Sequence, residues 1–219
     1  MKSTTGVRPR FPGVTVGVTG AIGSGKSQVC SALAALGRQV LSADPMAREL
    51  METDENLREQ LCSILGAGVY GPEGRLDRRK IAGLIFGDSG LRARVNAVVH
   101  PAVFRSIASR LESLPASESN PYVVIEAALV YESGMDRMLN AVVVVDAPPG
   151  ERLSRVLLRD GSSREDFLAR EAAQMKPAEK VRRADFVIRN VGSVEDLVDR
   201  ARFLDRLFVA MYRPAMHVM

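Results

Sequence analysis

The sequence contains few cysteines and no long apolar run. Only Cys30 and Cys62 are cysteines among its 219 residues, and neither lies at the spacing of a metal site. Both fall in helical patterns, which predicts reduced thiols and a cytoplasmic protein. No apolar stretch approaches the roughly 20 residues that span a bilayer, so the sequence predicts no membrane-spanning helix.

An excess of charge of one sign is also missing. The net charge is only +4, too small to indicate a nucleic-acid partner, and we expect neither a membrane nor an obligate protein partner. Arginine outnumbers lysine 25 to 5. Arginine side chains bind phosphate oxygens well, but codon bias accounts for such a ratio. The ratio therefore assigns no role to a single arginine, and only the position of an arginine in the sequence can indicate one. The first twelve residues hold three basic side chains and no apolar segment, which predicts a disordered leader and no export signal.

Apolar runs and helical patterns alternate along the chain. The predicted strands are 14–19, 38–43, 122–125, 141–145 and 186–188. Residues 55–114 contain no convincing strand and predict a helical insertion, with one helix ending near His100 because Pro101 disfavours its continuation. Ser162 with Glu165 predicts a capping box, and Ser193 the cap of a final helix. This order predicts an α/β fold with a doubly wound parallel sheet.

One segment fits the phosphate-binding pattern G-x-x-x-x-G-K-[ST], between a predicted strand and a predicted helix. Its residues are Gly20, Ala21, Ile22, Gly23, Ser24, Gly25, Lys26 and Ser27. The glycines let backbone N–H groups converge on a phosphate, and the helix adds free N–H groups at Ser27 and Gln28. The Lys26 ammonium suits the β- and γ-phosphates, and the Ser27 hydroxyl suits Mg²⁺. The segment predicts a nucleoside triphosphate site.

The second predicted strand ends at Ala43-Asp44, at the edge of the sheet where the phosphate loop also lies. A carboxylate there could orient an attacking hydroxyl or accept its proton. Asp44 also suits the N-cap of a helix beginning at Pro45, and the two roles are compatible. We therefore expect Asp44 to be catalytic.

Arginines recur at helical spacing in the predicted helix 149–159. Arg152, Arg155 and Arg159 share one face, and Arg164 follows at the start of the next helix. Arginines on a mobile lid could stabilise a transferring phosphoryl group, although a solvated face is the common alternative. We expect Arg155 and Arg159 to have this catalytic role.

Several sequence pieces together resemble the dephospho-CoA kinase family over most of residues 14–208. In order they are VTGAIGSGKS, VLSADPMAR, LDRRKIAGLIF, VVHP, ERLSRVLLRD, SREDFLAREAAQ and ADFVIRNVG. The resemblance implies a P-loop kinase-like enzyme that transfers the γ-phosphate of ATP to the ribose 3′-hydroxyl of dephospho-CoA, the last step of coenzyme A synthesis. It also implies three parts: a nucleotide-binding core at 13–44, 115–148 and 185–208, a helical CoA-binding domain at 45–114 and a lid at 149–184.

The resemblance also implies roles for single residues. Asp44 falls on the family's proposed catalytic base, and Arg155 and Arg159 on its lid arginines. Asn190 and Gly192 match the loop that closes over adenine. The positions expected to face the substrate are Asp44, Arg48, Arg79, Phe86 and His100. For His100 we expect a packing or substrate contact and no proton transfer.

The chain departs from the family pattern at two places. Ser42 replaces the first acid of an aspartate-alanine-aspartate run, which leaves Asp44 as the carboxylate there. The third long strand is followed by Glu126-Ala-Ala-Leu-Val where relatives commonly carry Pro-Leu-Leu. Glu126 could hold a magnesium-bound water, or could pair with a nearby arginine.

Other functions remain as alternatives. A nucleoside- or nucleotide-monophosphate kinase would use the same loop, base and lid with a smaller acceptor site, whereas the long helical insertion suits a longer substrate. A regulatory GTPase would carry N-K-x-D and D-x-x-G, and neither pattern occurs. A nucleotide-binding protein without activity is disfavoured, because Lys26, Ser27 and Asp44 are all present.

Overall fold

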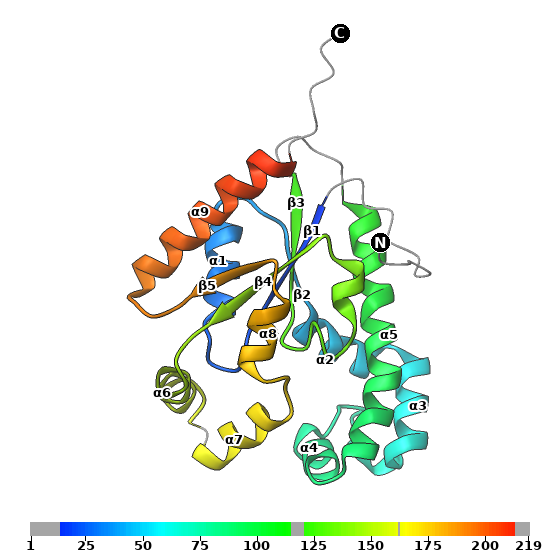
Figure 1. The fold of residues 1–219 in the computed structure, drawn as a ribbon. Coiled ribbons are helices and arrows are strands. Elements are labelled where there is room, and N and C mark those ends of the chain that lie inside the picture. Colours follow the sequence, from blue (N-terminus) through cyan, green and yellow to red (C-terminus); the bar gives the residue numbers. More distant parts are fainter. Residues whose placement is uncertain (1–13, 115–120, 162, 213–219) are drawn as a thin grey trace. The chain divides into compact units, whose positions relative to one another are not determined.

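The computed structural model describes residues 14–114, 121–161 and 163–212 (Figure 1). Within them, five parallel strands form one sheet in the order β2-β3-β1-β4-β5. The strands are β1 (Val14–Thr19), β2 (Val40–Ser42), β3 (Tyr122–Glu126), β4 (Ala141–Asp146) and β5 (Phe186–Arg189). Helical segments connect them, so the predicted α/β fold is confirmed. The second strand is shorter than predicted at both ends, since it begins at Val40 and a helix already begins at Ala43.

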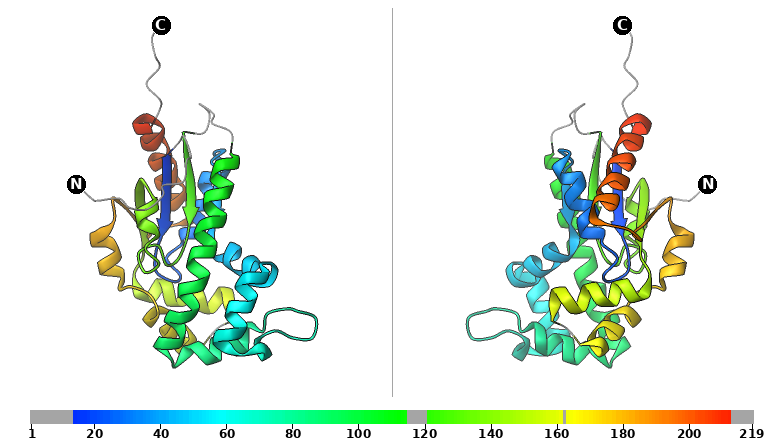
Figure 2. Two further views of the ribbon diagram at one scale, coloured as in Figure 1. Left: turned by 90° about the vertical axis from the view of Figure 1, so that its right-hand side faces the viewer. Right: turned by 90° about the vertical axis from the view of Figure 1, so that its left-hand side faces the viewer.

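Helices cover both faces of the sheet, as its apolar strands require. On one face, Val16 and Val18 of β1 form a core with α1 (Lys26–Ala35) and α9 (Val194–Tyr212), which pack side by side. On the other side, α8 (Pro177–Arg183) contacts β4 (Figure 2). All strands run in the same direction, so their carboxyl ends share one edge, where ligands bind in such sheets.

The described residues fold as two compact units, one formed by residues from 14–42 and 111–212 and the other by residues 43–110. The second unit is helical and has a small core of Val69, Leu76 and Ile81. Its elements are α2 (Ala43–Thr53), α3 (Glu55–Leu65), η1 (Ala67–Val69), α4 (Arg78–Phe86) and most of α5 (Ser89–Ser113). The roles assigned to the core, the insertion and the lid stay predictions, and residues 1–13 and 115–120 lie outside the described ranges.

The helix predicted to end near His100 continues, which is a correction. One helix, α5, runs through Pro101 to Ser113. Proline removes one backbone donor, and this costs stability in a helix interior. Here the buried side chains Val95, Val99, Ala102, Val103, Ile107 and Leu111 keep helical spacing on both sides of the proline. Burial of this stripe outweighs the local preference to end the helix.

Two helices, α6 (Pro149–Asp160) and α7 (Arg164–Ala172), follow β4. Ser162, predicted to cap α7, lies outside the described residues. The observed capping box is one residue later, where Ser163 and Asp166 exchange hydrogen bonds of 3.0 and 3.2 Å. Ser193 caps α9 as predicted, accepting from the N–H of Asp196 at 3.1 Å.

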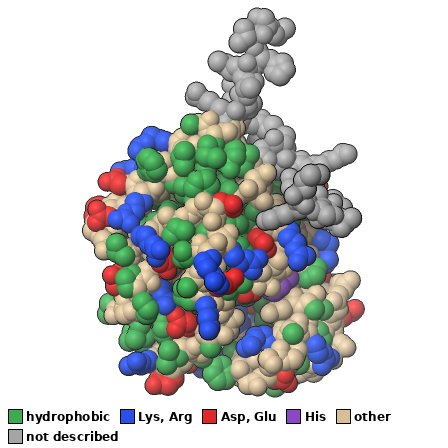
Figure 3. All heavy atoms as spheres, in the orientation of Figure 1, with side chains coloured by type: hydrophobic (Ala, Val, Ile, Leu, Met, Phe, Trp, Pro, Cys, Tyr) green, Lys and Arg blue, Asp and Glu red, His purple; other side chains and the backbone are tan. Residues whose placement is uncertain are grey.

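The surface of the face shown in Figure 3 carries acidic and basic side chains interspersed. Many charged side chains of the described residues form ion pairs, as Arg170 does with Asp160 at 3.2 Å. Across the described ranges, no helix combines the length and the apolar character needed to cross a membrane. Cys30 and Cys62 are free, and burial of Cys30 raises the pKa of its thiol.

A polar cluster joins α9 to the sheet. Asp205 is buried and accepts hydrogen bonds from the Tyr122 hydroxyl and from Nε of Arg38, both at 2.6 Å. Burial and the hydrogen bond to Asp205 raise the pKa of Tyr122. Two donors therefore depend on one buried carboxylate.

Asp205→Ala should lower the free energy of unfolding by about 3 kcal/mol, because it removes the acceptor that Arg38 and Tyr122 share. Urea denaturation measures this change. The control is Asp199→Ala, since Asp199 forms an exposed pair with Arg202 and should contribute less than about 1 kcal/mol. Equal effects of the two substitutions would contradict the prediction.

Candidate functional site

The loop between β1 and α1 has the geometry that its glycines predict. Gly23 and Gly25 have φ angles of 76° and 97°, in the left-handed region that favours glycine. A Cβ on Gly23 would lie 2.4 Å from the carbonyl oxygen of Arg152, so the loop and α6 lie too close for a side chain. Helix α1 then begins at Lys26 without a side-chain cap, which leaves the positive end of its dipole at the loop.

One detail of the predicted loop is corrected. The N–H of Gln28 donates to the carbonyl oxygen of Gly25 at 3.1 Å, so it is not free in this conformation. An N–H group in the first helical turn often bonds to the preceding loop in this way. The contact of Gln28 with ATP stays a prediction.

A pocket of about 490 Å³ lies beside the loop. Its lining residues come from the loop, the first turn of α1 and α6: Gly23, Ser24, Gly25, Lys26, Ser27, Gln28, Arg155, Leu158 and Arg159. The structure therefore brings most of the predicted phosphate-binding residues and both predicted lid arginines to one pocket. Gly20, Ala21 and Ile22 lie earlier in the loop and do not line it.

Arg155 lines this pocket, and one of its donors has no partner among the described residues. Its Nη2 pairs with Oε2 of Glu151 at 2.6 Å, one helical turn earlier. Its Nη1 is buried and has no hydrogen-bond partner among the described residues. A buried guanidinium nitrogen without an acceptor is costly, so this donor suits an anion bound in the pocket.

Arg159 is more exposed and is already paired. Its Nε and Nη2 donate to the Asp160 carboxylate at 2.6 and 3.0 Å, and this contact raises the pKa of Arg159 and lowers that of Asp160. Arg159 must therefore exchange this partner before it contacts a phosphate. The exchange costs little, because exposed ion pairs are weak.

Arg152 does not join the other two arginines, although the helical spacing placed all three on one face. Its side chain is only 2% exposed. It donates to the carbonyl oxygens of Ala147 and Ile22 at 3.2 and 3.4 Å and pairs with Glu171 at 2.6 Å. Arg152 thus contacts the backbone of the loop and does not line the pocket.

Asn190 also supports the loop. Its side chain is buried, and its Nδ2 donates to the carbonyl oxygen of Ser24 at 2.8 Å. Gly192 lies nearby before the cap of α9, where a Cβ would lie 2.3 Å from Oδ2 of Asp196. The adenine contacts of Asn190 and Gly192 stay predictions, and the structural contact of Asn190 was not foreseen.

Glu126 ends β3 between two hydroxyl groups. In the register of the sheet it lies opposite Val18 of β1 and Ser42 of β2. The Ser27 hydroxyl donates to Oε1 of Glu126 at 2.5 Å, and the Ser42 hydroxyl donates to Oε2 at 2.9 Å. The predicted alternative, an arginine partner, is not found among the described residues.

A hydroxyl and a carboxylate side by side are the oxygen ligands that Mg²⁺ accepts, usually with phosphate oxygens and water completing the octahedron. Ser27 and Glu126 fit this role. Among the described residues no group of three or more His, Cys, Asp or Glu side chains could hold a metal alone. Such a site would therefore need a phosphate ligand as well.

The predicted acceptor-site residues lie in the second unit. Asp44 is exposed in the first turn of α2, and it is not the N-cap because the helix begins at Ala43. Arg48 and Arg79 are exposed on α2 and α4, and Phe86 is 68% exposed at the end of α4. His100 is half-buried on α5 and stacks on Phe104 with ring centroids 6.4 Å apart. Their substrate roles stay predictions.

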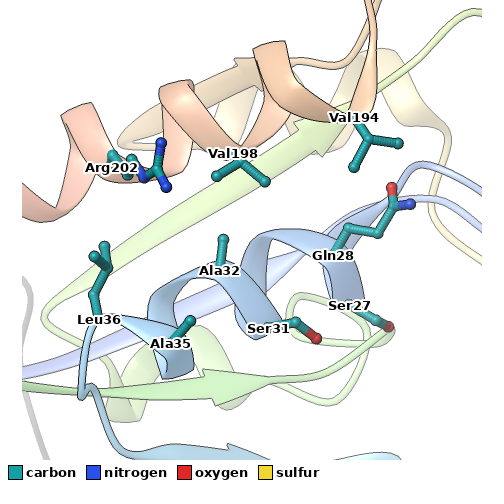
Figure 4. Close-up of a pocket in the computed structure, with 9 residues that line it drawn as sticks. All are labelled: Ser27, Gln28, Ser31, Ala32, Ala35, Leu36, Val194, Val198 and Arg202. Carbon is teal, nitrogen blue, oxygen red and sulfur yellow. The ribbon is translucent and has the colours of Figure 1, made fainter.

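A groove of about 520 Å³ runs between α1 and α9 (Figure 4). It shares Ser27 and Gln28 with the pocket described above. At this end, the side chain of Gln28 points toward Val194, the first residue of α9 (Figure 4). The remaining lining is largely apolar: Ser31, Ala32, Ala35, Leu36, Val198 and Arg202.

Gln174 is a functional candidate that the sequence did not reveal. It follows α7, and its Oε1 accepts from the N–H of Ile22 at 3.1 Å. It occurs in a quoted segment, SREDFLAREAAQ, but nothing in that pattern links it to a loop 152 positions away. Ser42, too, was expected only as a missing acid, and it is a partner of Glu126.

Comparison with known proteins agrees with this architecture. The sequence profile of the dephospho-CoA kinase family matches residues 14–196. A dephospho-CoA kinase from Thermus thermophilus is 43% identical over 184 residues, covering 84% of this chain and 86% of its relative. The crystal structure of TT1252 from Thermus thermophilus has a TM-score of 0.75 at 41% identity, covering 89% of this chain and 98% of that one. The structure of dephospho-CoA kinase from Campylobacter jejuni has a TM-score of 0.66 at 25% identity, covering 90% and 98%.

The family profile and the relatives cover the phosphate loop, the helical insertion and the helices after β4 together. A match limited to the phosphate loop would fit many nucleotide-binding proteins, whereas this match extends over most of the chain. The chain belongs to the dephospho-CoA kinase family.

Proposed function

We propose that this chain transfers the γ-phosphoryl group of ATP to the 3′-hydroxyl of the ribose of dephospho-CoA, forming coenzyme A and ADP. Family membership supports the acceptor and the reaction. The observation that carries the proposal is the pocket beside the phosphate loop at the positive end of α1, which is lined by Lys26 and by Arg155, whose Nη1 has no partner among the described residues. We place the reaction in the cytoplasm, in line with the free cysteines.

The chain's own residues act mainly by positioning and by charge. Lys26 neutralises the β- and γ-phosphates, and Arg155 and Arg159 stabilise the charge of the group in transfer. Ser27 and Glu126 would hold Mg²⁺, which would supply further neutralisation of the phosphate oxygens. Asp44 orients the ribose hydroxyl and accepts its proton. The adenosine extends from the shared Gln28 end of the pocket toward the loop of Asn190 and Gly192.

The substrate assignment is tested by ADP release with a series of acceptors. Dephospho-CoA should support turnover, while AMP, CMP, adenosine and pantetheine should each support far less. A preference for AMP or CMP would favour a nucleotide-monophosphate kinase instead. The two kinds of kinase handle ATP with the same phosphate chemistry, so only the acceptor series distinguishes between them.

Arg155→Ala should lower kcat about 10²-fold, because one preorganised donor to the transition state is lost. The matched control is Arg182→Ala on α8, an exposed arginine paired with Glu179 that does not line the pocket. Steady-state kinetics with saturating ATP and dephospho-CoA measures both variants. Equal activity of Arg155→Ala and the control would remove Arg155 from the mechanism.

A further inference from the structure

The backbone of Ile22, within the phosphate loop, is held at both its N–H and its carbonyl oxygen. Its N–H donates to Oε1 of Gln174 at 3.1 Å, and its carbonyl oxygen accepts from Nη1 of Arg152 at 3.4 Å. The backbone of Arg152 also lies against Gly23, the next loop residue. Neither Arg152 nor Gln174 lines the pocket. Their contacts therefore act on the loop and not on its ligand.

The two residues are linked to each other as well. Nη2 of Arg152 pairs with Oε1 of Glu171 at 2.6 Å, and its guanidinium carbon lies 5.7 Å from the centre of the Phe167 ring. Glu171 and Phe167 belong to α7, which ends just before Gln174. Because Arg152 is almost completely buried, these contacts are shielded from water and hold a defined geometry.

Hydrogen bonds attach the chain after Gln174 to the segment that follows β3. The N–H of Met175 donates to Oε1 of Glu132 at 2.6 Å, and the same carboxylate pairs with Nζ of Lys180 at 3.0 Å. Lys180 is fully buried and also donates to the carbonyl oxygen of Ala128 at 2.7 Å. Gln174 is thus held in place by the segment that follows β3.

We propose that Arg152 and Gln174 are positioning residues that clamp the backbone of Ile22 on both sides and so hold the phosphate loop in its nucleotide-binding conformation. The clamp ties the first turn of α6 and the segment directly after α7 to the backbone of one loop residue, so it couples this pair of helices to the loop. The inference rests on the proposed function in that the loop binds ATP. A loop that is ordered before binding loses less conformational freedom on binding, so the clamp increases the affinity for ATP.

The first test is Gln174→Ala, which removes the acceptor of the Ile22 N–H. The Kd of ATP, measured by calorimetry without an acceptor, should rise about 3–10-fold, the value of one hydrogen bond of this kind. The Kd of dephospho-CoA without nucleotide should stay within about twofold, and kcat at saturating ATP should change little. The control is Gln60→Ala, which removes an exposed glutamine amide on α3 and should change neither constant.

The second test is Arg152→Lys, chosen because Arg152→Ala would leave Glu171 without its buried partner. A lysine keeps the charge, but its single ammonium cannot serve Ala147, Ile22 and Glu171 together. The Kd of ATP should again rise, by about 10-fold. Because both side chains hold the backbone of the same residue, the double variant should lose clearly less affinity than the product of the two single losses.

Three results would overturn the inference. They are an unchanged Kd of ATP in folded Gln174→Ala, an equal loss of affinity for dephospho-CoA, or fully multiplicative losses in the double variant. Urea denaturation of each variant establishes that it is folded. Failure of the proposed function shows differently, because it appears in the wild-type chain as ATP binding without transfer to dephospho-CoA.

Discussion

Asp44→Ala should lower kcat about 10²–10⁴-fold, the usual contribution of a positioned general base, while the Kd of ATP stays nearly unchanged. The carboxylate follows β2 directly and is exposed in the first turn of α2, so substitution should not disturb the core of either unit. A proline at the next position suits a first helical turn, so the helix start does not depend on Asp44. Turnover is measured with saturating ATP and dephospho-CoA, and ATP binding by calorimetry.

Two further variants sharpen this prediction. Asp44→Asn keeps the size and one acceptor oxygen but cannot take a proton, so it should remain close to Asp44→Ala if proton acceptance matters. Glu49→Gln is the matched control on the same helix, since Glu49 makes only an exposed pair with Arg110 at 3.4 Å. Full turnover in Asp44→Ala would exclude this carboxylate from the chemistry.

Lys26→Ala should lower kcat/KM for ATP by about 10²–10³-fold, because it removes the ammonium at the start of α1 that lines the pocket and that we expect to face the phosphates. The substitution should weaken the binding and use of ATP, whereas Asp44→Ala should leave the binding of ATP nearly unchanged. The Kd of ADP should rise as well, since the β-phosphate loses the same partner. The fold should persist, because Lys26 is only partly buried and belongs to no ion pair among the described residues.

The comparison variants for Lys26 separate charge from geometry. Lys26→Arg keeps a positive charge but places a larger planar group in the pocket, so it should recover only part of the activity. Arg182→Ala removes one exposed positive charge elsewhere and should leave both constants unchanged. A loss of activity in Arg182→Ala as large as in Lys26→Ala would mean that net charge alone is responsible.

Local patterns predicted much of the fold. The strand positions and the phosphate loop follow from residues adjacent in sequence, and parallel pairing follows from apolar runs separated by helices. The wrong predictions rested on local sequence signals, and contacts from a wider stretch of the chain outweigh such signals. Pro101 does not end α5, because a buried stripe continues past it. The cap of α7 is Ser163, and the sequence did not single it out because Ser162 and Ser163 each precede an acid at the same spacing.

The candidate site was predictable only in part. Lys26, Arg155 and Arg159 share a pocket as expected. Arg152 has the same helical spacing but a different environment, because its turn of α6 lies against the loop backbone while the next turn lines the pocket. Helical periodicity predicts on which face of a helix a residue lies, but it does not predict which part of the protein packs against that face.

By itself, the sequence determined that this protein has a parallel α/β core with a phosphate loop, and motifs in order indicated its family. Only the tertiary structure decided that Glu126 accepts from both Ser27 and Ser42, and that Arg152 and Gln174 clamp Ile22. The physical reason is the separation in sequence between the residues that make each contact. A glycine turn and a helix start arise from neighbouring residues, whereas these contacts join residues 84 to 152 positions apart and exist only after the sheet has paired and its helices have packed.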